Sequence, residues 1–131
     1  MSNSTRIKID NCTKEQNGYP CFIPAQKILL LISKKWSIQL IHLLSKNKRL
    51  RYNEIKVQLQ KGWKKDKISD ATLSARLVDF TKEGIISREV FPELPPKVEY
   101  SLTMKGESLS KALKHLVDWT IDICHKETNE Q

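Results

Sequence analysis

Several residues and motifs that carry enzyme chemistry are scarce in this 131-residue chain. It has four glycines, and none belongs to a glycine-rich phosphate-binding loop. Its three cysteines, Cys12, Cys21 and Cys124, cannot all pair within one chain, and neither they nor the three histidines have the spacing of metal ligands. No nucleophile motif accompanies Cys21. We therefore expect no enzyme activity, no cofactor and no metal site.

Long apolar runs are also missing. The longest unbroken run covers Ile28–Ile32, far short of the roughly 18 apolar residues that a membrane span needs. The N-terminus has no apolar signal core. We expect a cytoplasmic protein in a reducing environment, with no membrane partner.

Positive charge is abundant and unevenly distributed. The chain carries a formal charge of +8 with an isoelectric point near 9.5. Residues 46–67 hold nine basic and two acidic side chains, which is +7. The basic ones are Lys46, Lys48, Arg49, Arg51, Lys56, Lys61, Lys64, Lys65 and Lys67. This concentration favours a polyanionic partner, nucleic acid before an acidic membrane surface, although a merely solvated face is the alternative.

The first half of the chain reads as a tail followed by three helices. Residues 1–19 are polar and aperiodic, which predicts a mobile tail. An apolar run over residues 24–32 predicts a short buried helix, and Ser37 is placed to cap a second helix. The buried side of this second helix is expected to comprise Ile38, Leu40, Ile41, Leu43 and Leu44. After a polar turn at residues 46–49, a third helix is expected over residues 52–59, then a basic loop over residues 60–67.

The second half combines one more short helix, a hairpin and a long helix. Ser69 is placed to cap a helix over residues 70–82 that ends at Gly84. Strands are expected over residues 85–91 and 98–103, joined by a loop with three prolines that stiffen it. Thr103 can cap a final helix of about 22 residues, roughly 33 Å long.

This order of elements predicts a mainly helical α+β fold, a winged helix-turn-helix with a long C-terminal dimerisation helix. The helices over residues 52–59 and 70–82 form the helix-turn-helix, and the hairpin forms the wing; an ordinary proline-rich hairpin is the alternative. We expect a domain over residues 20–126, with tails over residues 1–19 and 127–131.

The fold assigns DNA contacts to three regions. The outer face of the helix over residues 70–82 would lie in the major groove, because small and hydroxyl side chains allow close approach to base edges. Basic residues before it would contact phosphates and set the register. The expected DNA-binding residues are Lys48, Arg49, Arg51, Lys56, Ser69, Ala71, Thr72, Ser74, Ala75, Arg76 and Lys97. Arg76 has two interpretations, a phosphate clamp or a partner of a nearby carboxylate. Trp63 either stacks on a base or packs against the protein.

Several motifs resemble the HxlR-type transcriptional regulators, a family within the MarR-like winged-helix group. Residues 92–103, PELPPKVEYSLT, follow the wing signature of that family. The other matching motifs are Cys21, Lys35-Trp36, residues 51–55 (RYNEI), Ile68-Ser69 and residues 73–77 (LSARL). The chain departs from the pattern where Lys34 replaces a glycine, where a proline is displaced to Pro24, and where residues 60–67 are longer and more basic. The resemblance implies a DNA-binding regulator, with a protein-interaction module of the same fold as the alternative.

The resemblance also implies a homodimer. The apolar stripe of the last helix would pair with the helix over residues 24–32 of a second chain; a long helix lying on its own core is the alternative. Expected interface residues are Ile28, Leu31, Leu109, Leu113, Leu116, Val117, Thr120 and Ile121.

Regulators of this family often use the cysteine that Cys21 matches to sense an oxidant or an electrophile. Cys124, near the end of the last helix, is a candidate resolving partner. The alternative is that both thiols are structural, since lone cysteines are usually small buried hydrophobic residues.

Overall fold

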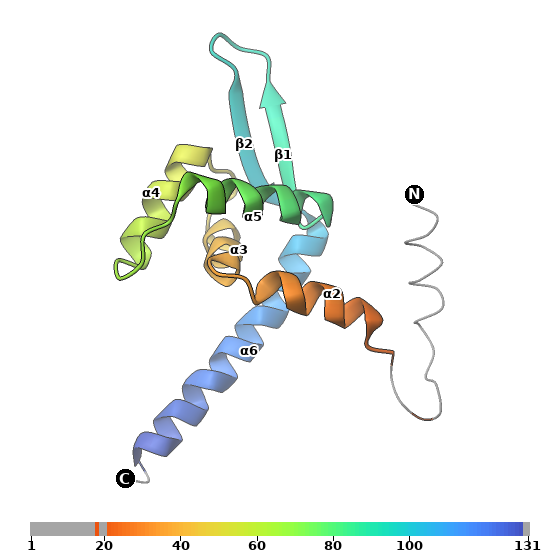
Figure 1. Ribbon diagram of the computed structural model, residues 1–131, viewed down its shortest axis with the longest axis vertical. Helices are drawn as coiled ribbons and strands as arrows, with labels where there is room; N and C mark the ends of the chain where they lie inside the picture. The colour runs from red at the N-terminus through yellow and green to blue at the C-terminus, as the bar shows by residue number, and fades with distance from the viewer. Residues whose placement is uncertain (1–17, 19–20, 130–131) are drawn as a thin grey trace. The chain divides into compact units, whose positions relative to one another are not determined.

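The computed structural model describes residue 18 and residues 21–129, in two compact units that meet after Lys35. Helix α2 (Ile23–Ile32) belongs to the first unit, and all later elements belong to the second (Figure 1). The boundary between the units falls inside the domain predicted for residues 20–126. The predicted N-terminal tail, including Cys12, lies outside the described residues except for Gly18.

Helix α2 is more exposed than its sequence predicts. It begins after Phe22, with Pro24 in the first turn, where the missing N–H has no helical partner to lose. Leu29 and Leu30 are 54% and 69% exposed, whereas only Leu31 and Ile32 are buried. The prediction of a buried helix is therefore wrong for the single chain. The run is apolar on nearly every side, and one chain does not cover all of it.

Helix α3 (Ser37–Lys46) begins differently from the prediction. Trp36 occupies the N-cap position with φ 75°, in the left-handed region, and Ser37 is the first helical residue rather than the cap. The Trp36 side chain is only 3% exposed. Its burial holds a backbone conformation that costs a non-glycine residue about 1 kcal/mol or more. The expected apolar side is confirmed at Leu40, Ile41, Leu43 and Leu44, while Ile38 is half-buried.

The two helices of the helix-turn-helix are α4 (Tyr52–Gly62) and α5 (Asp70–Lys82). Helix α4 runs three residues past its predicted end, so the basic loop starts at Trp63 instead of Gln60. Helix α5 has the predicted bounds because both of its ends are locally encoded. The Ser69 hydroxyl accepts a hydrogen bond from the Thr72 N–H at 3.1 Å, and Gly84 follows with φ 73°.

The wing is an antiparallel hairpin of β1 (Ile86–Phe91) and β2 (Lys97–Leu102). Its register pairs Phe91 with Lys97 at the tip and Ile86 with Leu102 at the base, and residues 92–96 form the connection, which contains a cis Leu94–Pro95 bond. Leu50 adds a short third rung, since its N–H and carbonyl both bond to Tyr100. Each strand is one residue displaced from its predicted start.

The last helix, α6 (Met104–Asn129), has 26 residues and leaves the helical body in a direction roughly opposite to the hairpin (Figure 1). Thr103 caps it as predicted, accepting from the Gly106 N–H at 3.0 Å. The helix is longer than the 22 or so residues expected, so residues 127–129 are helical rather than part of a tail.

The core of the second unit lies where α3 packs against α4, α6 and β2, and α5 packs against β1. Its apolar residues include Leu40, Ile41, Leu44, Ile55, Leu59, Leu73, Leu77, Phe80, Ile85, Ile86 and Leu113. Among the described residues no single helix is long and apolar enough to cross a membrane; α2 and α3 reach that length and composition only when joined across their break. The same part of the chain contains no cluster of three or more potential metal ligands.

Candidate nucleic-acid interface

The outward face of α5 is built from small side chains. Ala71, Ser74 and Ala75 are exposed and Thr72 is half-buried, as the sequence predicts. The Ser69 hydroxyl, besides capping α5, donates to Thr72 Oγ1 at 2.9 Å. Because Thr72 Oγ1 accepts this bond, its own proton remains available to an acceptor outside the protein. The arrangement gives α5 an oriented hydroxyl donor in its first turn.

A polar cluster joins α4 to the start of α5. Lys56 and the Tyr52 hydroxyl each donate to Asp70 Oδ1 at 2.8 Å. The bond from Lys56, and then that from Tyr52, lowers the pKa of Asp70, and the same carboxylate raises the pKa of Lys56. Burial raises the pKa of Tyr52. The ammonium of Lys56 is thus positioned by Asp70, and its predicted phosphate contact stays a prediction.

Arg49 lies at the base of the wing between two carboxylates. Glu89 and Glu99 face each other directly across the hairpin, an arrangement that repels on its own. The Arg49 guanidinium is 3.7 Å from Glu89 and 3.8 Å from Glu99. The cation therefore offsets this repulsion and ties the segment before α4 to the wing. A phosphate would compete with both carboxylates for Arg49.

Lys97 is held in a similar way near the wing tip. Its ammonium lies 3.6 Å from Glu99 and 5.4 Å from the centre of the Phe91 ring. The predicted phosphate contact would require Lys97 to share its charge with Glu99. Leu94, in the connection beyond it, is 99% exposed, so the tip projects freely into solvent.

A groove of about 320 Å³ separates α5 from the hairpin. Its lining residues are Tyr52, Ser74, Leu77, Val78, Thr81, Lys82, Arg88 and Tyr100. Lys82 and Arg88 are exposed and bring two positive charges to this groove. Arg88 was missed by the sequence analysis, because nothing in the pattern of β1 distinguishes a strand residue that faces α5 from one that faces solvent.

The remaining predicted contacts lie around these groups. Lys48 and Arg51 are exposed just before and at the N-cap of α4, where the Arg51 N–H donates to Glu54 at 2.9 Å. Arg76 is half-buried on α5. Trp63 packs rather than projects: its ring meets His42 edge to face, with 6.5 Å between ring centres.

The predicted interface residues divide into exposed and enclosed groups. On α6, Leu116 and Ile121 are each 47% exposed and Val117 is 39% exposed, and the neighbouring Trp119 is 60% exposed. Leu113, by contrast, is buried in the core of its own unit. The other predicted members are the exposed Thr120, the half-buried Ile28 and Leu109, and the buried Leu31.

Both described cysteines are free thiols. Cys21 is half-buried and precedes α2, and Cys124 is exposed on α6. The predicted pairing of these two residues is a prediction about an assembly of two chains.

The chain belongs to the HxlR-like helix-turn-helix family, whose model matches residues 31–128. It is 37% identical over 93 residues to the uncharacterized HTH-type transcriptional regulator BH0655 of Halalkalibacterium halodurans, an overlap of 71% of this chain and 77% of that protein. The resemblance drawn from the motifs is therefore confirmed. The chain is a transcriptional regulator of the HxlR and MarR-like helix-turn-helix type.

Solved structures agree with the winged-helix fold. The reduced form of the transcriptional regulator YodB from Bacillus subtilis superposes with a TM-score of 0.67 and 29% identity, covering 78% of this chain and 93% of YodB. The redox regulator HypR in its oxidised form gives a TM-score of 0.63 and 29% identity, covering 76% and 95%. The predicted fold class is confirmed.

Proposed function

We propose that this regulator binds duplex DNA sequence-specifically as a homodimer at an inverted repeat. The observation that carries the proposal is α5, whose exposed face is small, hydroxyl-bearing and flanked by cations. A helix with such a face can approach the floor of the major groove, and Thr72 can donate to a base or phosphate oxygen. Asp79 and Glu83 would repel phosphates and are assigned no contact.

The surroundings of α5 divide into positioning and reading groups. The wing carries Lys97, and the groove beside it carries Lys82 and Arg88. The cations at the start of α4 are Lys48 and Arg51, with Lys56 close to Asp70. These groups would neutralise phosphates and set the register without reading sequence.

The homodimer is supported by apolar surface that a single chain leaves exposed. Leu116, Trp119 and Ile121 on α6 are each about half exposed or more, as are Leu29 and Leu30 on α2. Contiguous apolar surface of this kind marks interaction sites in soluble proteins. Two copies joined through these helices would present two copies of α5 to half-sites one DNA turn apart, roughly 34 Å.

Titration of labelled duplexes tests the proposal. The probe is the DNA that flanks the protein's own gene, cut into overlapping duplexes and compared with a shuffled sequence at several salt concentrations. We expect one duplex to bind at least about 10³-fold more tightly than the shuffled control, with affinity falling steeply as salt rises. Equal, salt-independent binding to every duplex would instead indicate a winged-helix module that recognises another protein.

We also propose that the regulator responds to oxidants or electrophiles through Cys21. The support is the position of this free thiol just before the partly exposed α2, together with the similarity to HypR, a redox regulator. A covalent change at Cys21 would alter how α2 packs in the dimer and so change the spacing of the two recognition helices. Cys124 is the candidate resolving thiol, supplied by the second chain.

Diamide treatment of wild type and Cys21→Ser tests this second proposal. We expect wild type to release its DNA and Cys21→Ser to stay bound, with mass spectrometry separating a Cys21–Cys124 link from a simple adduct. Cys124→Ser is the matched control, because it should keep the adduct at Cys21 and lose the link. Equal release by wild type and Cys21→Ser would show that the thiol only packs.

A further inference from the structure

The loop between α4 and α5 is a folded structure that presents lysines. Lys64, Lys65 and Lys67 are all exposed in it, and the only acidic residue in the loop is Asp66. Within the described part of the chain no ion pair holds any of these three lysines. The net charge of residues 63–67 is therefore +2, from three lysines and one aspartate.

A single side chain closes this loop. The Gln60 amide donates to the Asp66 carbonyl at 2.7 Å and accepts from the Ile68 N–H at 3.3 Å, so it binds both faces of the loop's end. Trp63 fixes the beginning of the loop by packing on His42. The buried Ile68 then leads directly into Ser69, the cap of α5. The lysines are consequently held near the N-terminal end of the recognition helix.

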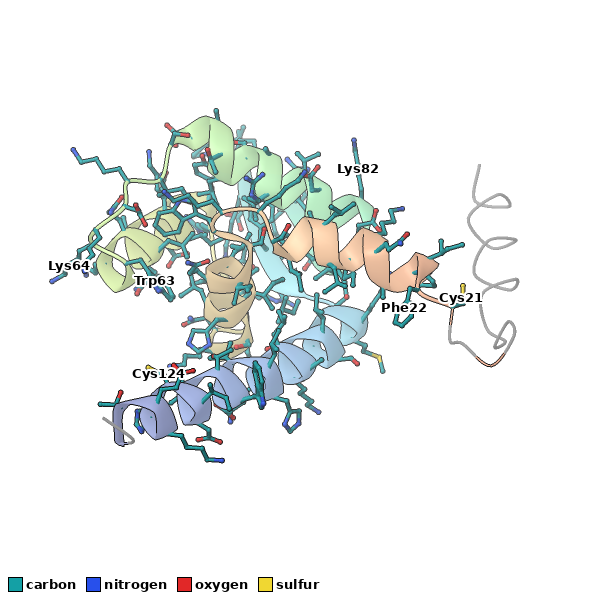
Figure 2. All side chains as sticks on the ribbon, turned by 60° about the horizontal axis from the view of Figure 1, so that its bottom comes forward. Cys21, Phe22, Trp63, Lys64, Lys82 and Cys124 are labelled. Atoms are coloured by element: carbon teal, nitrogen blue, oxygen red, sulfur yellow. The ribbon has the colours of Figure 1, made fainter. Side chains whose placement is uncertain are left out.

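We infer that this lysine loop, residues 63–67, is an additional phosphate-binding site for the DNA backbone, on the opposite side of α5 from the wing groove. The inference rests on the proposed DNA binding and extends it. Figure 2 places Lys64 on the loop that precedes α5 and Lys82 toward the other end of the helix. The helix has 13 residues, about 20 Å at 1.5 Å per residue. Cations at its two ends can therefore meet the phosphate strands on both sides of a major groove about 12 Å wide.

An anionic membrane is the weaker candidate for the same charge. Binding at a membrane surface gains from apolar side chains that insert among the lipids. The one aromatic residue of the loop, Trp63, is half-buried against His42. Its orientation leaves the loop with charge and no inserting group, which suits phosphates of a duplex better.

The experiment compares two double variants that remove the same charge. Lys64→Ala/Lys65→Ala changes the loop, and Lys111→Ala/Lys126→Ala removes two exposed lysines from α6 as the control. Full-length proteins are titrated with a labelled mixed-sequence duplex of about 40 base pairs, long enough for two half-sites and their flanks. The dependence of log K on log salt is measured between about 50 and 200 mM.

The loop variant should flatten the salt dependence by up to about 1.8, since each lost phosphate contact removes about 0.9 from the slope. At 0.1 M salt this corresponds to an affinity about 10- to 60-fold weaker. The α6 variant should keep the wild-type slope. A loop variant with the wild-type slope, or two variants with equally reduced slopes, overturns the inference. Wild type that binds no duplex at all refutes the proposed function itself.

Two further measurements decide how the loop acts. Gln60→Ala should weaken DNA binding severalfold while keeping the slope, because the lysines remain but must be ordered on binding. Unchanged affinity in this variant would show that the closed loop is not what positions the lysines. Vesicles containing phosphatidylserine serve as a second probe: loss of vesicle binding in Lys64→Ala/Lys65→Ala, with DNA binding intact, would reassign the loop to a membrane.

Discussion

Replacing Gly106 with alanine should destabilise the protein although alanine is the better helix former. Gly106 is buried in the first turn of α6, and a Cβ built there would collide with the Ile85 carbonyl oxygen. It would also lie 3.1 Å from the Ile85 carbonyl carbon and 3.1 Å from a Leu102 methyl carbon. Since the obstacle is backbone, no side chain can rotate to make room.

The magnitude follows from three contributions. Overpacking of this kind costs about 1–3 kcal/mol. The Ile85 carbonyl also accepts from the Thr103 N–H at 3.0 Å, so displacing it weakens the cap of α6, which contributes about 1 kcal/mol. The helix preference of alanine over glycine returns about 1 kcal/mol. The net loss of about 1–3 kcal/mol should lower Tm by roughly 4–12 °C for a domain of this size.

Gly62→Ala is the matched control. Gly62 is also the helical glycine at one end of an element, but a Cβ there meets nothing within 4 Å. The same substitution should therefore leave stability unchanged or raise it by up to about 1 kcal/mol. Thermal and urea unfolding of both variants measure the difference. If Gly106→Ala were as stable as Gly62→Ala, the close approach of α6 to Ile85 would be wrong.

Three further outcomes are expected. Asp70→Asn should remove a pH dependence: because Lys56 holds the pKa of Asp70 below its usual 3.8, their interaction stabilises the wild type above that pH and is lost as the pH falls through the lowered pKa, and urea unfolding across the acidic range would show no such loss in the variant. Leu116→Glu should give a monomer in light scattering, and a wild-type mass would contradict the role of α6 in assembly. Lys97→Ala should weaken all duplexes alike and flatten the salt slope by about one, whereas Thr72→Val should change the ranking of duplexes; the reverse pattern would exchange the roles of wing and helix.

Local signals made much of this fold predictable. Helix α5 has its predicted bounds because Ser69 bonds the N–H three residues later and Gly84 takes a left-handed conformation. Thr103 starts α6 for the same kind of reason. The outer face of α5 followed from the spacing of Leu73, Leu77 and Phe80, since residues four and seven apart share one side of a helix.

Errors arose where a residue's state depends on distant parts of the chain. Ser37 looks like a helix cap, yet Trp36 takes that position because its ring is buried. Leu30 belongs to an apolar run that predicts burial, but whether any chain covers it is decided by packing. The basic loop was two to three residues shorter than predicted, since α4 continues through Gly62.

The sequence by itself determined the order of the elements, the face of α5 that points outward and the concentration of positive charge. Only the tertiary structure decided which cations already have carboxylate partners. Arg49 meets Glu89 and Glu99, 40 and 50 residues later, and Lys56 meets Asp70 across the turn. Capping and periodicity act over a few bonded neighbours and can be read along the chain. Coulomb attraction depends on separation in space, which sequence distance does not give until the chain has folded.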